Sequence, residues 1–477
     1  MIPNCVARRA RGAGAWLVGA EVGATTATHD LLFHRTCDRC CPTNWDVGRV
    51  VWLSALAPAG AAAEATLPEE TALLVTEPPF CPVSARRTAL QMYFEDLQFA
   101  SVATKLASTL AFAHSLSRTE TGSASGSASG SGNNNGNSSN GNSNKNGIWA
   151  GVVVDTGFGA SWVVPHVVAG ENVVPVAGAV RRVDVGGKVL TNVLKEAVSF
   201  RHWNMMQEVA LVRDVMERAC FVSQDFARDL RPPARVPPRH YLLPDYSTSA
   251  TGHVLTPAEM AAWLSAHDSS SSSSNGTSAG EAASAVDEAR CVRRMKAAGE
   301  QVLSLGCEQF AVPEVLFNPS DVGINQCGVA DAVGDAVRAV SRVTYTGDSL
   351  MLAALADALY ARVLLRGGCA RFPGFRDRMD AELRAVAPSR CPFSVQLSDE
   401  FVHVSLLLFF VFFFTLVVYH GGKTVQSAMR GTVENSLQAT LNTLLRCRSP
   451  ATSTTSMGLI MFFVSSTLVD MKSMLTK

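Results

Sequence analysis

The sequence predicts an α/β protein whose two lobes bind a phosphate-bearing ligand between them. Two observations point to this fold class: a glycine hairpin at residues 151–168, and a pattern of strand, double glycine and helix that occurs twice after it. The length agrees, because 477 residues are many for one domain and two lobes or more are expected.

The hairpin has the sequence GVVVDTGFGASWVVPHVV, in which two apolar runs flank an acid and two glycines. This pattern predicts a β-hairpin with Asp155 at its mouth. Gly157 and Gly159 leave no Cβ between the backbone amides and an incoming anion, and Asp155 can hold Mg²⁺ through water. A nucleotide-binding hairpin and a surface hairpin that only satisfies turn geometry are both compatible with these residues.

Asp-Thr-Gly after an apolar strand is also typical of aspartic proteases. That chemistry requires two carboxylates that share a proton, and therefore a second loop or a symmetric dimer. The chain contains no second Asp-Thr-Gly and no Asp-Ser-Gly, which disfavours a protease.

The strand–glycine–helix pattern occurs at Arg182–Val198 and again at Ala361–Val386. Apolar residues at helical spacing follow each glycine pair, and a further helical stripe runs from Met205 to Ala219. Before the hairpin, Leu73–Thr76 predicts a short strand, and Ala85–Leu116 predicts helix. Each glycine pair is weak evidence alone, because glycine at a strand–helix junction more often serves packing.

Two low-complexity stretches, 119–147 and 269–283, consist mainly of small and polar residues. They cannot bury apolar surface, so we expect disordered insertions in surface loops. Acidic and basic residues balance at 41 each, so net charge gives no argument for nucleic acid or an anionic membrane. Cys37, Cys40 and Cys41 could supply zinc ligands, but no second cysteine pair follows at finger spacing, and ordinary thiols are favoured.

The tail after about Ser398 departs from the pattern before it. Val404–Tyr419 is uncharged and almost wholly apolar, slightly short of the roughly 20 residues that cross a bilayer. The segment is compatible with a membrane anchor, or with translated non-coding sequence or an alternative terminus. We favour the second interpretation.

Several motifs together resemble the core of the actin superfamily. They are DTGFGASWVVPHVV, RVDVGGKVLTNVLKE, RACFVSQDF and LRGGCARFPGFRDRM. The block FAVPEVLFNPSDVGI, with IPNC, NWDV and VTEP, resembles the actin-related protein 6 subfamily in particular. The resemblance runs from about residue 2 to residue 397.

The resemblance implies an actin-like fold of two RNase-H-like lobes around a nucleotide cleft. The expected order is a first lobe at 1–118, truncated at its start, an insertion at 119–147, and a second lobe at 148–388. The chain would return to the first lobe at 389–400, and 401–477 would form a divergent tail.

The resemblance also implies a set of nucleotide-binding residues. Matched motif by motif, they are Asp155, Gly157, Gly159, Gly187, Glu217, Gly367 and Gly368. Asp155 would hold Mg²⁺ through water if ATP binds. Three departures weaken this expectation. No first phosphate hairpin precedes IPNC, the hydrolytic glutamine falls near Ala100, and the basic adenosine contact becomes Met216. We therefore expect no ATP hydrolysis and treat ATP binding as doubtful.

The subfamily implies a role as a non-catalytic scaffold in a SWR-class chromatin remodeller, which exchanges a histone variant into nucleosomes. Its expected partners are a Swi2/Snf2-type motor, a zinc-HIT subunit and the nucleosome, and its expected location is the nucleus, with the cytoplasm second. Two alternatives are a cytosolic ATPase or cytoskeletal protein of the actin/Hsp70 type, and a membrane-anchored protein.

We predict that the insertions are dispensable for folding. Deleting 119–147 or 269–283 should leave soluble expression unchanged, since each doubling of loop length costs only about 0.6 kcal/mol. Soluble yield of each deletion beside the full chain measures this, and aggregation of either deletion would contradict it.

Overall fold

A computed structural model describes residues 4–398, apart from 10–14, 20, 23–30, 57–71, 125–148, 171, 233–235, 247–248, 250, 268–281, 344–348 and 390. The apolar segment Val404–Tyr419 and most of both predicted insertions lie outside these residues. Among the residues that are described, no helix is long and apolar enough to cross a membrane.

A six-stranded sheet forms the centre of the second lobe. Its strands are β8 (Ala150–Thr156), β9 (Ser161–Ala169), β10 (Asn172–Pro175), β11 (Arg181–Val183), β15 (Val363–Arg366) and β16 (Val395–Leu397). The order is β10-β9-β8-β15-β16, with β11 paired to β9. The β8–β9 hairpin is antiparallel, whereas β15 runs parallel to both β8 and β16. The predicted hairpin and the α/β class are confirmed.

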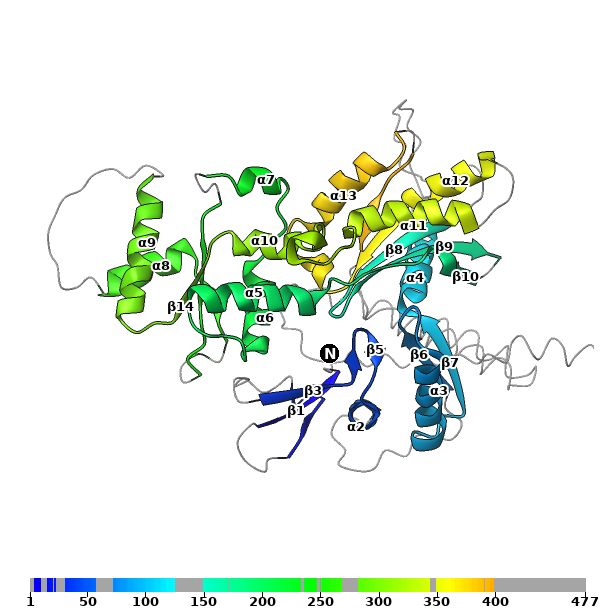
Figure 1. Cartoon of the computed structure of the whole chain (residues 1–477), viewed down its shortest axis with the longest axis horizontal. Coiled ribbons are helices and arrows are strands. Elements are labelled where there is room, and N and C mark those ends of the chain that lie inside the picture. Colours follow the sequence, from blue (N-terminus) through cyan, green and yellow to red (C-terminus); the bar gives the residue numbers. More distant parts are fainter. Residues whose placement is uncertain are drawn as a thin grey trace, which may run out of the picture.

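Helices cover both faces of this sheet (Figure 1). On one face lie α11 (Val329–Val343), α12 (Ser349–Tyr360) and α13 (Phe375–Val386), and on the other lies α4 (Ala107–Ala124). The alternation of β8 follows from this: Val152 and Val154 enter the main core, while Val153 packs with Phe112 of α4. Gly151 allows α4 to approach, because a Cβ there would lie 2.4 Å from the Phe112 ring.

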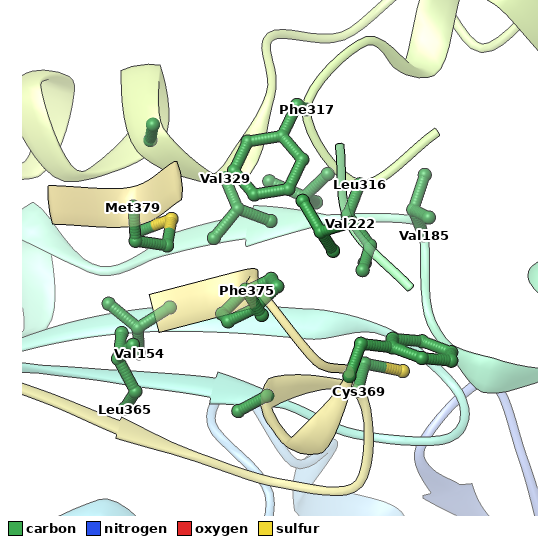
Figure 2. Packing of buried hydrophobic residues seen from close by; sticks show 14 of the residues in the cluster. Val154, Val185, Val222, Leu316, Phe317, Val329, Leu365, Cys369, Phe375 and Met379 are labelled. Carbon is green, nitrogen blue, oxygen red and sulfur yellow. The ribbon is translucent and has the colours of Figure 1, made fainter. Parts of the chain in front are cut away.

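The main core fills the space between the sheet and the three helices, as Figure 2 shows. Phe375 and Met379 on α13 are fully buried and lie against Val154 and Leu365 of the sheet. Side chains of this size each contribute about 1.5–3 kcal/mol when removed from water. The apolar spacing predicted for 375–386 therefore serves the core.

The rest of the second lobe extends away from this sheet. Two helices, α5 (Gly187–Arg201) and α6 (Val209–Ala219), pack against each other where the sequence predicts them. The far end contains a three-stranded sheet and two helices with a small core of their own. Its elements are β12 (Arg239–Leu242), β13 (His253–Val254), β14 (Val302–Leu305), α8 (Pro257–His267) and α9 (Ala282–Ala297). Short helices α7 (Phe226–Asp229) and α10 (Glu308–Glu314) connect this end to the centre.

The described residues before 125 form three small sheets. Their strands are β1 (Cys5–Arg9), β2 (Leu17–Val18), β3 (Leu31–Arg35), β4 (Cys37–Asp38), β5 (Cys41–Pro42), β6 (Ala72–Glu77) and β7 (Ser101–Leu106). The sheets are β2-β1-β3, β4-β5 and β6-β7. Their helices are α2 (Trp45–Leu56), α3 (Val83–Gln91) and a π-helical turn, Met92–Asp96.

Three boundaries differ from the sequence prediction. The helix expected at Ala85–Leu116 is interrupted, because Gln98 takes a left-handed φ of 55° and Ser101–Leu106 then forms β7 parallel to β6. At the insertions, α4 runs on to Ala124 and α9 begins at Ala282, so helix occupies the margins of both stretches. Finally, β16, expected to return to the first lobe, pairs with β15 in the sheet of the second.

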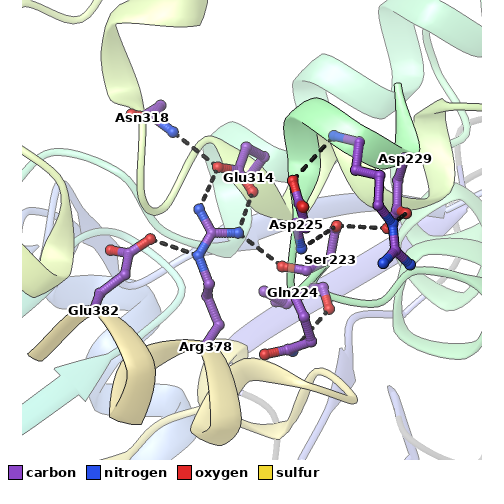
Figure 3. A network of polar contacts seen from close by, with 10 residues as sticks. Ser223, Gln224, Asp225, Asp229, Glu314, Asn318, Arg378 and Glu382 are labelled. Carbon is purple, nitrogen blue, oxygen red and sulfur yellow. Dashed lines mark hydrogen bonds and ion pairs between the residues drawn. The ribbon is translucent and has the colours of Figure 1, made fainter. Parts of the chain in front are cut away.

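A buried ion-pair network connects α10, α13 and the loop before α7 (Figure 3). Arg378 donates to both carboxylate oxygens of Glu314, at 3.1 and 2.8 Å, and also to the carbonyl of Ser223 at 2.7 Å. The Glu314 side chain is 1% exposed and that of Arg378 12%. Because Glu314 belongs to the FAVPE block and Arg378 to the FPGFRDR motif, this contact joins two of the segments that carry the resemblance.

The turn after the FAVPE sequence contains a short 3-10 helix. Pro319 begins a 3-10 helix, Pro319–Val322, as its fixed φ predicts. Asn318 precedes that helix but makes no capping bond, because its side-chain amide donates to Glu314 at 2.8 Å. The Asn318 side chain therefore completes the buried network.

Glu314→Ala should lower stability strongly, since it removes the buried carboxylate of Arg378 and leaves only that of Glu382, which is 31% exposed. Removing one partner of a buried pair typically costs about 3–5 kcal/mol. The matched control is Asp335→Ala, which removes an exposed pair with Arg338 and should cost less than about 1 kcal/mol. Thermal unfolding midpoints of the two variants measure the difference, and equal midpoints would contradict this role for the network.

Candidate functional site

The site is organised around the four-residue turn that joins β8 to β9. Thr156 and Ser161 are the last paired residues, and the Gly157 amide donates to the Ala160 carbonyl at 3.2 Å. Asp155 is the second-last residue of β8, and Thr156 separates it from this turn. The carboxylate of Asp155 thus lies at the C-terminal end of an apolar strand, beside the turn, as the sequence predicts.

The turn rests on the first residues of α5. The Gly187 amide donates to the Gly157 carbonyl at 3.0 Å, and the Lys188 amide donates to the Phe158 carbonyl at 2.8 Å. Free amides at a helix start are a common anion site. Here the amides of Gly187 and Lys188 already donate to carbonyls of the turn, so Gly187 stabilises the hairpin.

The second glycine pair lies beside the same turn. Gly367 follows β15 with φ of +98°, and its Cα faces the Thr156 carbonyl closely enough that a Cβ would lie 2.3 Å away. Gly368 has open space around its Cβ position. The thiol of Cys369 then donates to the Gly157 carbonyl at 3.6 Å, and burial raises the pKa of this thiol to about 12.

Residues of the N-terminal part close over the turn from the other side. A Cβ at Gly159 would lie 2.8 Å from the Cys40 sulfur, and the Arg35 guanidinium sits 4.2 Å from the centre of the Phe158 ring. An ion pair of 2.9 Å joins Asp38 to Lys188. These contacts bring the β4–β5 hairpin against the turn.

A pocket of about 260 Å³ opens next to the turn. It is lined by Cys40, Thr76, Glu77, Pro78, Pro79, Ala107, Ser108, Asp155, Gly157, Ala160, Trp162 and Val164. The lining is mainly apolar and slightly smaller than the roughly 300 Å³ at which small-molecule sites begin. Within the part of the chain that the structure describes, the buried Ser108 hydroxyl has no hydrogen-bond partner, so a polar ligand or a water molecule would complete it.

Both carboxylates that line the pocket are already paired with arginines. Asp155 lies 3.3 Å from Arg366, and Glu77 forms two bonds with Arg86 at 2.8 and 2.9 Å. Burial raises the pKa of Asp155, and the Arg366 charge opposes that rise. Arg366 is not among the predicted site residues, although it stands directly before the predicted glycine pair, Gly367 and Gly368.

The residues present do not fit the Mg²⁺ ion expected at Asp155. Magnesium requires oxygen ligands in near-octahedral geometry, usually one or two carboxylates together with substrate phosphates. Here the carboxylates that line the pocket are each engaged by a guanidinium. Among the described residues, no group of three or more His, Cys, Asp or Glu is placed to hold a metal ion. The zinc interpretation of Cys37, Cys40 and Cys41 therefore finds no site, and their thiols are free.

The remaining predicted positions lie apart from the pocket. Glu217 is 58% exposed on α6 and pairs with Arg213 at 3.2 Å, within electrostatic reach of Cys369. Met216 is buried in the core, where it accepts a weak bond from Thr191 at 3.9 Å. Ala100 is exposed and precedes β7. The opposite end of β7 leads to Ala107 and Ser108, which do line the pocket.

Comparisons with known proteins agree with the motifs. A family model described as Actin matches residues 1–403. Among curated proteins, Actin-related protein 6 of Oryza sativa subsp. japonica is 30% identical over 396 residues, 81% of each chain. The protein of the same name from Arabidopsis thaliana is 31% identical over 338 residues, 70% of this chain and 68% of its own. That from Drosophila melanogaster is 27% identical over 393 residues, again 81% of each chain.

Gly367→Ala should destabilise the protein by about 2 kcal/mol or more, because the positive φ strains an alanine and its Cβ meets the Thr156 carbonyl. The control is Gly368→Ala, one residue on, where the helical φ of −65° and the open space accept a methyl group. Thermal unfolding compares the two variants. A Gly367→Ala protein as stable as Gly368→Ala would show that this contact does not matter.

Proposed function

Because this chain belongs to the actin family, we propose that it acts as a non-catalytic scaffold subunit of a SWR-class chromatin-remodelling complex in the nucleus, which exchanges a histone variant into nucleosomes. Its relatives from rice, Arabidopsis and Drosophila, all named Actin-related protein 6, support this proposal. The motor activity would belong to a Swi2/Snf2-type subunit, and a zinc-HIT subunit would bind beside this chain.

The charge pattern of the pocket supports a non-catalytic role. Hydrolysis of a nucleotide requires a metal ion and an oriented water molecule, and such positioning contributes orders of magnitude in rate. Arg366 and Arg86 instead occupy the two carboxylates that line the pocket. We infer that the cleft stabilises the fold and does not turn over ATP.

The observation that carries the partner assignment is the rigid surface turn that follows the FAVPE block. Ser320 and Asp321 are exposed at this turn, although the block before it is almost wholly buried. Gly323 ends the short helix in a left-handed conformation, and Gln326 exchanges two hydrogen bonds with Asp184 at 2.7 and 2.9 Å. A turn fixed at both ends loses little entropy on binding, which favours it as a recognition surface.

The double change Ser320→Glu with Asp321→Lys should therefore release the partners while the protein stays folded. We expect recovery of the Swi2/Snf2-type motor and the zinc-HIT subunit from nuclear extract to fall about tenfold, as loss of a central interface contact predicts. Asp380→Lys, an exposed charge change on α13, is the matched control and should leave recovery unchanged.

Two outcomes would oppose the proposal. One is recovery of the tagged wild-type chain with cytoskeletal or membrane proteins and without remodeller subunits. The other is equal loss of partners in the Asp380→Lys control, which would mean that the turn has no special role.

A further inference from the structure

Arg366 is a buried charged residue at the end of an otherwise apolar strand. It pairs in register with Asp155 on the neighbouring parallel strand β8, and its side chain is 8% exposed. The strand residues before it, Val363–Leu365, are also buried. A cation at such a place requires compensation, because removing a charge from water without a partner costs several kcal/mol.

Two partners of this guanidinium belong to the pocket wall. Its Nε lies 3.3 Å from the Asp155 carboxylate, and its Nη1 donates to the Ala107 carbonyl at 2.6 Å. Ala107 is the first residue of α4, which follows β7 of the N-terminal part, while Asp155 and Arg366 belong to the sheet of the second lobe. The side chain thus bridges two segments that meet at the pocket. Its own carbonyl accepts the Thr156 hydroxyl at 3.1 Å, which fixes the backbone beside the turn.

A second cation at Asp155 would meet this guanidinium. A metal ion bound to the carboxylate would stand a few ångströms from the Arg366 charge, where like charges in a buried site repel strongly. The other carboxylate of the pocket, on Glu77, offers no relief because Arg86 binds both of its oxygens.

We propose that Arg366 is a built-in cation of the cleft: its guanidinium takes the place at Asp155 that a divalent ion would need, excludes Mg²⁺-bound nucleotides, and holds α4 on the second-lobe sheet without a ligand. Arg366 therefore restricts the pocket to ligands that carry no metal ion. The Arg366 side chain also joins Ala107 to Asp155, a connection that would otherwise require a bound ion.

Divalent-ion binding by the full chain tests this directly. Mn²⁺ serves as the probe, followed by its electron paramagnetic resonance signal, and thermal unfolding is measured with Mg²⁺ alone, ATP alone and both. The wild-type protein should show no Mn²⁺ binding that depends on Asp155 and no midpoint shift that requires Mg²⁺. A wild-type site for Mn²⁺ that Asp155→Asn abolishes would overturn the proposal.

The variant Arg366→Met removes the charge and keeps most of the volume. We expect it to bind Mn²⁺ about tenfold or more tightly than the wild type, because Asp155 is then free to act as a ligand. Its midpoint should fall in the absence of metal and rise again with Mg²⁺. A folded Arg366→Met protein without any response to metal would contradict the proposal.

Arg366→Lys and the double variant Arg366→Met with Asp155→Asn are the matched controls. Lysine keeps the positive charge and should bind no Mn²⁺. The double variant removes both charges, so it should regain part of the stability lost in Arg366→Met and should bind no Mn²⁺. If Arg366→Met does not fold, the wild-type and lysine titrations still decide the question, since Asp155-dependent Mn²⁺ binding in either would overturn it.

Discussion

The constraint on which the site depends is the backbone contact between the β8–β9 turn and the start of α5. A Cβ at Gly186 would lie 2.7–2.8 Å from the Gly157 carbonyl, the Ala160 amide and the Phe158 carbonyl, so only glycine allows this approach. The approach lets the Gly187 and Lys188 amides bind two turn carbonyls. The same turn also places Gly159 against Cys40. A side chain at 186 would separate the helix from the hairpin and shift Gly157 and Ala160, which line the pocket.

Local patterns in the sequence predict the parts of this arrangement that depend on neighbouring residues. The hairpin, both strand–glycine–helix units and the core stripe of α13 are of this kind, because alternation and helical spacing are read within a few residues. The segment at Ser101–Leu106 is harder, since its short mixture of apolar and polar residues fits a strand or a helix equally well. Its pairing with β6 decides the matter, and that pairing lies outside any local window.

Polar residues with distant partners could not be assigned from the sequence. Asn318 stands at a suitable place for a cap, but the buried Glu314 carboxylate recruits its amide. An arginine at the end of a strand is typical of a surface position, so the sequence around Arg366 does not indicate its partner. The parallel pairing of β15 with β8 places it beside Asp155. The glycines around the turn differ from these residues, because their role in backbone geometry is recorded directly in a motif. The charge balance of the pocket depends instead on which side chains the fold brings together.

The Glu314–Arg378 pair restricts how descendants of this sequence can change. A lineage that loses Arg378 leaves Glu314 buried without a counter-charge, and one that loses Glu314 leaves Arg378 with only the more exposed Glu382. A lineage that replaces both Glu314 and Arg378 by apolar residues of similar volume keeps its stability. A single substitution at either position therefore lowers stability, and we expect the two positions to change together during evolution. Asn318 is drawn into the same unit through its bond to Glu314, so three positions spread over two motifs should vary together across a population of related genomes.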